Sequence, residues 1–276
     1  MELSGIFGAP LRRLEVVEST NLLLKAEAEA GLAEEGAVVV AEHQIAGRGR
    51  LDRRWEAPPG KALLFSALLY PDLEPDKLPL AGLMVAIAVY DGICLSVGRN
   101  YELRIANYEL DKSKIQNSAF RIPHSAFILK WPNDILAGGR KLCGILCESG
   151  VDPKERRFVV AGVGLNVNQT ADDFPGKLRG TATSLYLITN QTQPRDALLG
   201  SILNGIESHY NRLKESGANW VVQEWLERAK IVGEPLTVWD GAIQVTGVCD
   251  GLDGDGSLRL ALPDCQIKII RSGDVT

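Results

Sequence analysis

Hydrophobic and polar residues alternate in blocks along the first hundred residues, and the length of each block indicates its structure. The apolar runs "GAVVVAEH" (36–43) and "KALLFSALLY" (61–70) are short, which predicts two buried strands. Residues 19–30 begin with Ser-Thr-Asn and continue with "LLLKAEAEA" before Gly31, so they predict a capped helix. The long apolar segment 78–97 contains many small residues and predicts a buried helix.

The same blocks continue in the second half of the chain. The segment 125–134 reads as a strand, which must end near Pro132 because proline cannot donate to a strand ladder. Two apolar runs around a Gly-Gly pair predict a hairpin over 134–149. A further strand is predicted over 157–168, and two helices fill 194–230.

The pattern changes after Lys230, where short strand-like runs follow one another and are broken by Gly and Asp. This spacing predicts a small β-barrel of about 45 residues, with a domain boundary near 231–233. The polar segment 99–124 lies between a buried helix and a buried strand, and we expect a long surface loop or an extra hairpin there.

Composition excludes several classes of protein. The chain has 276 residues, 45% of them hydrophobic, which allows one large domain or two unequal ones with a sizeable core. A formal net charge of −5 argues against general nucleic-acid or membrane-surface binding. We find no apolar run of membrane-spanning length, no secretion signal, and an odd set of five cysteines without zinc-site spacing. We therefore expect a reduced, cytoplasmic protein.

The segment "AGRGRLDRRW" (46–55) contradicts the acidic balance, because it places four arginines between Arg48 and Arg54. Glycines free the backbone so that its N–H groups converge on an anion, and arginine forks match phosphate geometry. The segment is therefore a candidate phosphate-binding loop, which we expect to be mobile until an anion offsets its self-repulsion. A solvated surface loop and a nucleic-acid contact are the alternatives.

Three further segments carry polar groups in unusual places. The Ser-Thr-Asn at 19–21 caps a helix in the simplest interpretation, and binds a polar ligand in the other. Lys141 enters an apolar strand, where it needs either an ion pair, for which Asp134 is the candidate, or a bound anion. Asn166 lies in the apolar, glycine-containing run "GVGLNVN" (162–168), where backbone groups or a nucleotide must satisfy its amide.

Five segments, taken in chain order, resemble the motifs of biotin protein ligases, and the resemblance spans roughly residues 15 to 270. They are "STN" (19–21), "GRGRLDRRW" (47–55), "KWPND" (130–134), "GRKLCGIL" (139–146) and "GVGLNVN" (162–168). The resemblance implies an α+β fold. Its catalytic domain would have a mixed sheet of the class II aminoacyl-tRNA synthetase and biotin ligase type, over 1–231, and an SH3-like β-barrel would follow over 232–276.

The resemblance also implies a two-step ligase reaction. Biotin and ATP, with Mg²⁺, give biotinyl-5′-AMP and diphosphate, and a lysine of a biotin carboxyl carrier domain then takes the biotinyl group and releases AMP. The carboxylase concerned would be one such as acetyl-CoA carboxylase. Both steps build negative charge near the α-phosphate, so the arginine loop would stabilise that charge and close over the anhydride.

The resemblance assigns three overlapping sets of residues by their match to the motifs. The biotin-binding set is Ser19, Thr20, Asn21, Gln44, Arg48, Gly49, Arg50 and Lys141. The nucleotide-binding set is Arg48, Arg50, Arg53, Trp55, Asn133 and Asn166. The catalytic set is Arg48, Arg50, Lys141 and Asp134, with Asp134 orienting the incoming lysine or a magnesium ion whose ligands stay undefined.

Some features depart from the family's pattern. Asp52 stands where the family has glycine; aspartate tolerates left-handed backbone, but its charge should slightly weaken the loop's positive potential. Cys143 replaces a small, alanine-like residue, and 99–124 exceeds the family's short connection. The motifs also start too near the N-terminus for a preceding helix-turn-helix domain, so we expect no transcriptional repression, no nucleic-acid partner and no membrane association.

Two other functions compete with biotin ligation. A lipoate–protein ligase would share the catalytic architecture, and biotin and lipoate titrations would separate the two. A non-catalytic anion-binding or RNA-binding module could use the arginine loop and the barrel, but the acidic balance counts against it. The oligomeric state is open, since the family includes both monomers and homodimers.

Overall fold

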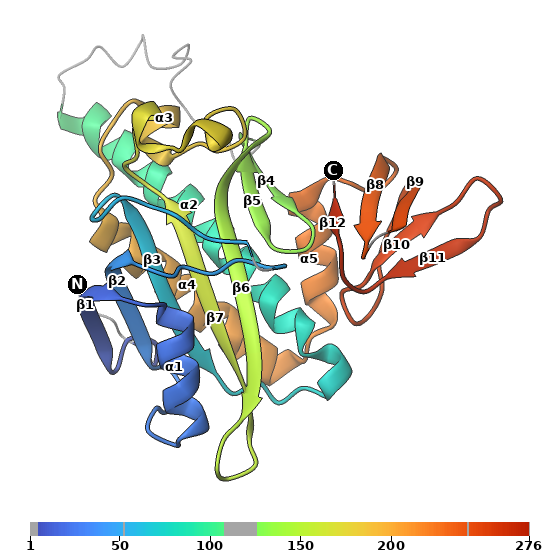
Figure 1. The fold of residues 1–276 in the computed structure, drawn as a ribbon, viewed down its shortest axis with the longest axis horizontal. Coiled ribbons are helices and arrows are strands. Elements are labelled where there is room, and N and C mark those ends of the chain that lie inside the picture. Colours follow the sequence, from blue (N-terminus) through green and yellow to red (C-terminus); the bar gives the residue numbers. More distant parts are fainter. Residues whose placement is uncertain (1–4, 52, 108–125, 242, 276) are drawn as a thin grey trace.

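The computed structural model describes residues 5–51, 53–107, 126–241 and 243–275. Within them lie a seven-stranded mixed sheet with helices on both faces and a five-stranded antiparallel sheet near the C-terminus (Figure 1). This is the α+β architecture that the sequence predicted, with the two sheets in the expected order along the chain.

The larger sheet has the strand order β1-β2-β3-β7-β6-β5-β4. β1 pairs with β2 in parallel, and all the other pairs in this sheet are antiparallel. Its strands are β1 (Leu11–Val17), β2 (Val38–Gln44), β3 (Ala62–Leu69), β4 (Phe127–Lys130), β5 (Asp134–Ala137), β6 (Arg140–Val151) and β7 (Arg157–Asn166). The predicted strands and the hairpin are thus confirmed, with β4 ending just before Trp131 and Pro132.

Helices cover both faces of this sheet, which explains why all eight residues of β3 are buried. α1 (Thr20–Glu29) packs on one face over a small core that includes Leu24, Leu68 and Phe158. The helices on the other face enclose the main core (Figure 1). They are α2 (Pro79–Asn107), α4 (Arg195–Ser216) and α5 (Asn219–Ala229). The cavity described below lies on the α1 side.

Two parts of the fold differ from the expectation. Residues 99–107 continue α2 to Asn107, so the prediction of a loop or hairpin from residue 99 is wrong there, and 108–125 lie outside the described residues. Glu, Leu, Arg and Ala favour a helix even where the segment is polar. The edge strand β1 was not foreseen, because charged residues suit an exposed sheet edge but mask the strand pattern. The short helix α3 (Leu185–Thr189) was also not foreseen.

One described segment, Pro75–Gly98, is long and apolar enough to cross a membrane by length and composition. The expectation that no apolar run reaches that length is therefore wrong. The segment contains most of α2, and 83% of its most apolar window is buried inside the protein. This segment is apolar on all sides because the sheet and the neighbouring helices α4 and α5 enclose it.

The smaller sheet has the strand order β11-β10-β9-β8-β12 and packs against α2, α5 and the turn after β4. Trp131 Nε1 donates to Gly256 O at 3.1 Å, which joins that turn to the small sheet. The last strand, β12, returns to the larger sheet's cavity. The strands are β8 (Pro235–Asp240), β9 (Ile243–Leu252), β10 (Leu258–Ala261), β11 (Ile267–Ile270) and β12 (Asp274–Val275).

Candidate functional site

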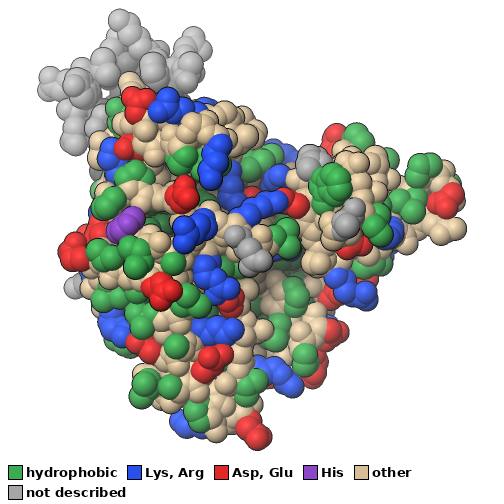
Figure 2. Space-filling view, viewed as in Figure 1, with side chains coloured by type: hydrophobic (Ala, Val, Ile, Leu, Met, Phe, Trp, Pro, Cys, Tyr) green, Lys and Arg blue, Asp and Glu red, His purple; other side chains and the backbone are tan. Residues whose placement is uncertain are grey.

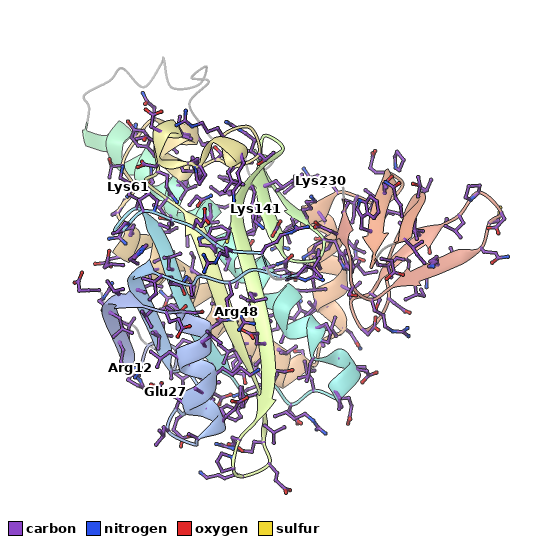
Figure 3. The ribbon with its side chains drawn as sticks, viewed as in Figure 1. Arg12, Glu27, Arg48, Lys61, Lys141 and Lys230 are labelled. Atoms are coloured by element: carbon purple, nitrogen blue, oxygen red, sulfur yellow. The ribbon has the colours of Figure 1, made fainter. Side chains whose placement is uncertain are left out.

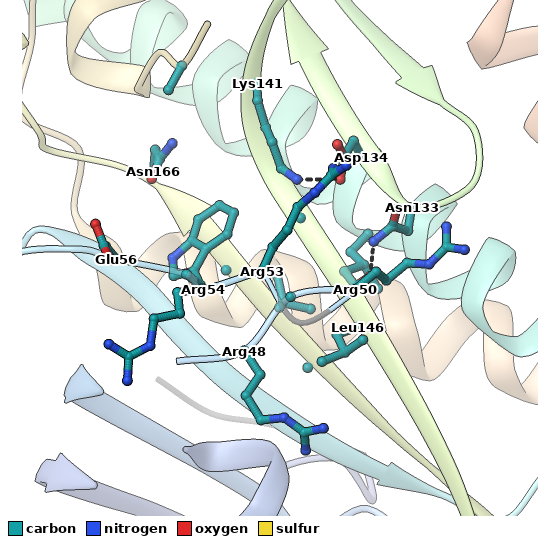
Figure 4. Close-up of a pocket in the computed structure, with 18 of the residues that line it drawn as sticks. Arg48, Arg50, Arg53, Arg54, Glu56, Asn133, Asp134, Lys141, Leu146 and Asn166 are labelled. Carbon is teal, nitrogen blue, oxygen red and sulfur yellow. Dashed lines mark hydrogen bonds and ion pairs between the residues drawn. The ribbon is translucent and has the colours of Figure 1, made fainter. Parts of the chain in front are cut away.

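A cavity of about 440 Å³ lies between the start of α1, the arginine loop (residues 47–55), strands β5 to β7 and the end of the chain. Figure 2 shows Lys and Arg side chains gathered on this face of the molecule, and Figure 4 shows those that line the cavity. Every residue that the family resemblance assigned lines it. They are Ser19, Thr20, Asn21, Gln44, Arg48, Gly49, Arg50, Arg53, Trp55, Asn133, Asp134, Lys141 and Asn166. Their roles stay predictions.

One end of the cavity is built from uncharged polar side chains. Gln44 Oε1 accepts hydrogen bonds from the backbone N (2.8 Å) and Oγ1 (3.1 Å) of Thr20. Ser66 Oγ lies 2.7 Å from Thr20 Oγ1 and 2.6 Å from Asn21 Oδ1. Thr20, Asn21 and Ser66 are all buried. This network holds several groups in defined orientations, which suits a neutral polar ligand.

Helix α1 begins where the sequence predicted, with Ser19 at the N-cap position, but the Ser19 side chain does not cap it. Ser19 is extended and occupies the N-cap position, and its carbonyl accepts from Leu23 N at 3.1 Å. Its side chain makes no capping hydrogen bond. The simplest interpretation of the hydroxyl, a helix cap, is therefore not what the structure contains.

Glycines in β7 make room for the groups above the sheet. A Cβ atom on Gly162 would lie 2.0 Å from Asn21 Oδ1, and one on Gly164 would lie 2.6 Å from Trp55 Cε2. Both distances are shorter than any side chain tolerates, so the run "GVG" is required for Asn21 and Trp55 to reach the sheet. Sequence reasoning noted these glycines without finding this reason.

Trp55 forms part of the cavity wall over β6 and β7. Its indole Nε1 is buried and has no hydrogen-bond partner among the described residues, which leaves a donor at the site. Lys141 Nζ lies 5.7 Å from the centroid of the indole ring, within range of a cation–π contact. The indole therefore offers a flat apolar surface and one free donor on the same wall as a lysine.

Lys141 makes the ion pair that was one of the two alternatives at this position. Its Nζ lies 2.7 Å from Asp134 Oδ1, and the two side chains are 37% and 16% exposed (Figure 4). The β5–β6 hairpin brings them together through a tight turn at Gly138 and Gly139, both with positive φ. The lysine stays partly open to the cavity, so the pair does not exclude a role towards an anion.

The arginine loop folds back on itself as a small hairpin. Gly49 N donates to Arg53 O at 2.8 Å, and Trp55 N donates to Gly47 O at 3.0 Å. A Cβ atom on Gly47 would meet Trp55 O at 2.4 Å, so this close approach requires glycine. Asp52, where the chain departs from the family's glycine, lies outside the described residues.

The arginines of this loop point in different directions (Figure 4). Two of them form ion pairs with carboxylates. Arg48 Nη1 lies 3.1 Å from Glu148 Oε1 on β6, and Arg53 forms an ion pair with Asp274 on β12. Burial lowers the pKa of the Arg50 guanidinium from its ordinary value, although the nearby carboxylates raise it. The self-repulsion expected for the loop is therefore partly offset within the protein, and its mobility before anion binding stays a prediction.

The two asparagines assigned to the nucleotide, Asn133 and Asn166, donate hydrogen bonds within the protein. Asn133 Nδ2 donates to Ile145 O at 2.7 Å, which holds the turn after β4 against β6. Asn166 Nδ2 donates to Thr183 O at 3.0 Å, and its Oδ1 accepts from Gln169 Nε2 at 2.8 Å. One backbone group and one side chain thus satisfy Asn166, so the backbone interpretation is realised in part, and any nucleotide contact would be additional.

Sequence reasoning missed three residues that bond to the side chains of the site. Ser66 carries a signal, since it is the single polar residue in the apolar strand β3. Glu148 is a charged residue that follows an apolar run, which is a weaker signal. Asp274 has no local signal at all, because only the fold brings the end of the chain to the arginine loop.

Comparisons with known proteins agree with this site. The model of the Biotin/lipoate A/B protein ligase family matches residues 14–166. The chain is 32% identical over 270 residues to the Bifunctional ligase/repressor BirA of Bacillus spizizenii, covering 98% of this chain and 74% of that protein. It is 29% identical over 273 residues to the Biotin--[acetyl-CoA-carboxylase] ligase of Mycobacterium tuberculosis, covering 97% and 90%.

The fold is also similar to solved structures. The biotin protein ligase from Aquifex aeolicus, in complex with biotin and ATP, superimposes with a TM-score of 0.72 at 27% identity. The match covers 96% of this chain and 97% of that one, so it includes both sheets.

Proposed function

The chain belongs to the biotin/lipoate A/B protein ligase family, and from this premise we propose that it attaches biotin to a lysine of a biotin carboxyl carrier domain, using ATP and passing through biotinyl-5′-AMP. One observation carries the proposal. A single cavity combines a buried, uncharged polar end around Thr20 and Asn21 with an arginine loop and Lys141. Such a cavity fits a neutral ring system at one end and a phosphate at the other.

The polar end favours biotin over lipoate. The ureido group of biotin offers one carbonyl acceptor and two N–H donors, whereas the dithiolane ring of lipoate offers neither. A site whose buried polar groups are built to bind such a ligand rejects an analogue that leaves those groups unpaired. The buried side chains of Thr20 and Asn21, which Ser66 holds by hydrogen bonds, form such a site.

The first step joins the two substrates. A carboxylate oxygen of biotin forms a bond to the α-phosphorus of ATP, and the bond from that phosphorus to the leaving diphosphate breaks. Lys141 is placed to offset the carboxylate's charge as the phosphate approaches, while Arg48 and Arg50 stabilise negative charge on the α-phosphate. The face of Trp55 supports the nucleotide.

The second step transfers the biotinyl group. The neutral ε-amine of the carrier lysine attacks the acyl carbon of the mixed anhydride, the bond from that carbon to the phosphate oxygen breaks, AMP leaves, and the proton lost by the amine passes to solvent. Asp134 is a carboxylate at the cavity that can accept a hydrogen bond from the amine and orient it. The arginine loop covers the anhydride during this step and excludes water that would hydrolyse it.

Magnesium would enter with the triphosphate of ATP. Among the described residues, no three His, Cys, Asp or Glu side chains gather closely enough to hold a metal ion. Mg²⁺ commonly takes substrate phosphates, water and only one or two carboxylates as ligands. Asp134 would hold the ion in the alternative to orienting the lysine, and the ion would neutralise charge on the phosphates.

The protein substrate and the compartment follow from the same proposal. The relative from Mycobacterium tuberculosis is named for acetyl-CoA carboxylase, and we assign a carrier domain of that kind to this chain. All five cysteines are free of disulfides, in keeping with a cytoplasmic location. Residues 1–231 would form the catalytic domain and 232–276 the small C-terminal domain, with the boundary in the connection between α5 and β8.

Labelling with biotin tests the proposal. The protein is incubated with radiolabelled biotin, MgATP and a carrier domain, and a carrier without its target lysine serves as the control. Label should enter only the intact carrier, and exchange of labelled diphosphate into ATP should depend on biotin. Labelling by lipoate but not by biotin would identify a lipoate ligase instead.

A further inference from the structure

Glu148 lies on β6 just outside the cavity wall. Ile145 and Leu146 of the same strand line the cavity, whereas Glu148 does not. Its side chain is 16% exposed, and it is held between Asn21 at the biotin end and Arg48 of the arginine loop. Any effect of Glu148 on the reaction must therefore pass through those two neighbours.

The first neighbour is Asn21. Asn21 Nδ2 donates to Glu148 Oε2 at 3.0 Å and to Leu146 O at 3.0 Å. Both partners can only accept, so together they use both protons of the amide nitrogen and fix which way the amide points. Asn21 Oδ1 is consequently turned towards Ser66, at 2.6 Å from its hydroxyl.

The second neighbour is Arg48. Its Nη1 donates to Glu148 Oε1 at 3.1 Å, and the arginine side chain is 42% exposed. A guanidinium has five N–H donors, so one contact to Glu148 leaves others for an anion in the cavity. Glu148 thus holds Arg48 at the cavity wall without consuming its capacity to bind a phosphate.

We propose that Glu148 is a positioning residue for the ligation reaction, which sets the orientation of Asn21 at the biotin end and of Arg48 at the phosphate end. The inference rests on the proposed function of the cavity. Without the carboxylate, the Arg48 side chain would become ordered only when the phosphate binds. The conformational entropy lost in that ordering would weaken binding.

Stability alone does not explain this arrangement. An ion pair to an arginine this exposed contributes little to folding, because water screens the charge of the guanidinium. The ion pair between Arg12 and Glu27 has nearly the same exposure, 43% and 21%, and lies away from the cavity. Figure 3 shows Arg12 and Glu27 together near α1 and apart from Arg48 and Lys141. Glu27→Gln is therefore a matched control.

Two substitutions separate the two contacts of Glu148. Glu148→Gln keeps an acceptor for Asn21 but removes the charge that holds Arg48. It should speed the release of biotinyl-5′-AMP and raise the KM for ATP by about threefold to fivefold, with biotin affinity changed by less than about twofold. Glu148→Ala also removes the acceptor, and should weaken biotin binding by a further factor of about five to ten.

The measurements are calorimetric titration with biotin and a rapid-dilution assay of adenylate release, both corrected for the folded fraction from thermal unfolding. Glu27→Gln should match the wild type in both. Two results would overturn the inference: Glu148→Gln weakening biotin binding and adenylate retention equally, or leaving both unchanged. If the wild type itself formed no adenylate, the proposed function would fail instead, and the two failures are thereby distinct.

Discussion

The two ends of the cavity hold their side chains in opposite ways. At the biotin end, Thr20 and Asn21 are 3% and 4% exposed, and their partners come from neighbouring strands. At the phosphate end, the side chains of Arg48 and Arg53 are 42% and 62% exposed. They form ion pairs with carboxylates on β6 and β12. Neutral groups can be buried if they bond to one another, whereas four arginines cannot.

This difference indicates how each end recognises its ligand. The biotin end is organised in advance, so its specificity comes from shape and from hydrogen bonds that a wrong ligand cannot replace. The phosphate end is held by ion pairs whose arginines are exposed, and such pairs are weak and easily exchanged for a phosphate. A rigid end and an adjustable end suit a reaction in which the neutral ring stays in place while the charge on the other substrate changes.

The largest expected effect comes from breaking the rigid end. Gly162→Val should reduce biotin affinity by more than about 100-fold, because its side chain would occupy the position of Asn21 Oδ1. Titration with biotin measures the loss. Gly180→Val is the control, since a Cβ there meets no atom within 4 Å, and unimpaired binding by Gly162→Val would contradict the close packing described here.

Lys141→Ala should come next, and should separate chemistry from binding. We expect adenylate formation to slow by about 100-fold, the scale of losing one charge-stabilising donor, while biotin affinity changes much less. Single-turnover adenylation and a biotin titration give the two values. Lys61→Ala removes an ion pair of similar exposure, 39% and 19%, outside the cavity (Figure 3). Equal losses in both measurements would mean that Lys141 supplies binding energy alone.

Arg48→Ala should have a smaller effect, confined to the adjustable end. Its side chain is 42% exposed, so the fold should be intact, while biotinyl-5′-AMP should dissociate about tenfold faster. Thermal unfolding and adenylate release are the two measurements, with Arg12→Ala as the control of equal exposure. A variant that unfolds yet keeps full activity per folded molecule would rule out the phosphate role.

Asp274→Asn should give the smallest effect, because it loosens the arginine loop through Arg53 alone and keeps every assigned binding residue in place. Losing the ion pair to Arg53 should raise the rate of tryptic cleavage within the loop by about twofold to fivefold in the free protein. Asp250→Asn, which breaks the exposed pair with Arg259 on the same small sheet, is the control. Identical cleavage of both variants would show that the C-terminal strand does not restrain the loop.

The order of the elements could be read from the chain because apolar runs have the length and period of the elements they form. The strands 36–43 and 61–70 and the buried helix from residue 78 all follow this rule. The edge strand β1 and the end of α2 broke it, since neither is an apolar run. The helix propensity of the residues determines the end of α2, and the position at the sheet edge determines β1. The polarity of these segments alone would predict loops.

Every residue that the motifs assigned to the site lines the cavity. The motifs could identify these residues because the chemistry of arginine, glycine and lysine is local to each segment. They could not supply the partners. Glu148 lies 100 positions from Arg48, and Asp274 lies 221 positions from Arg53. Hydrogen bonds and ion pairs act over a few ångströms in space. Only the folding of the sheet, and the return of the last strand to it, decides which carboxylate meets which arginine.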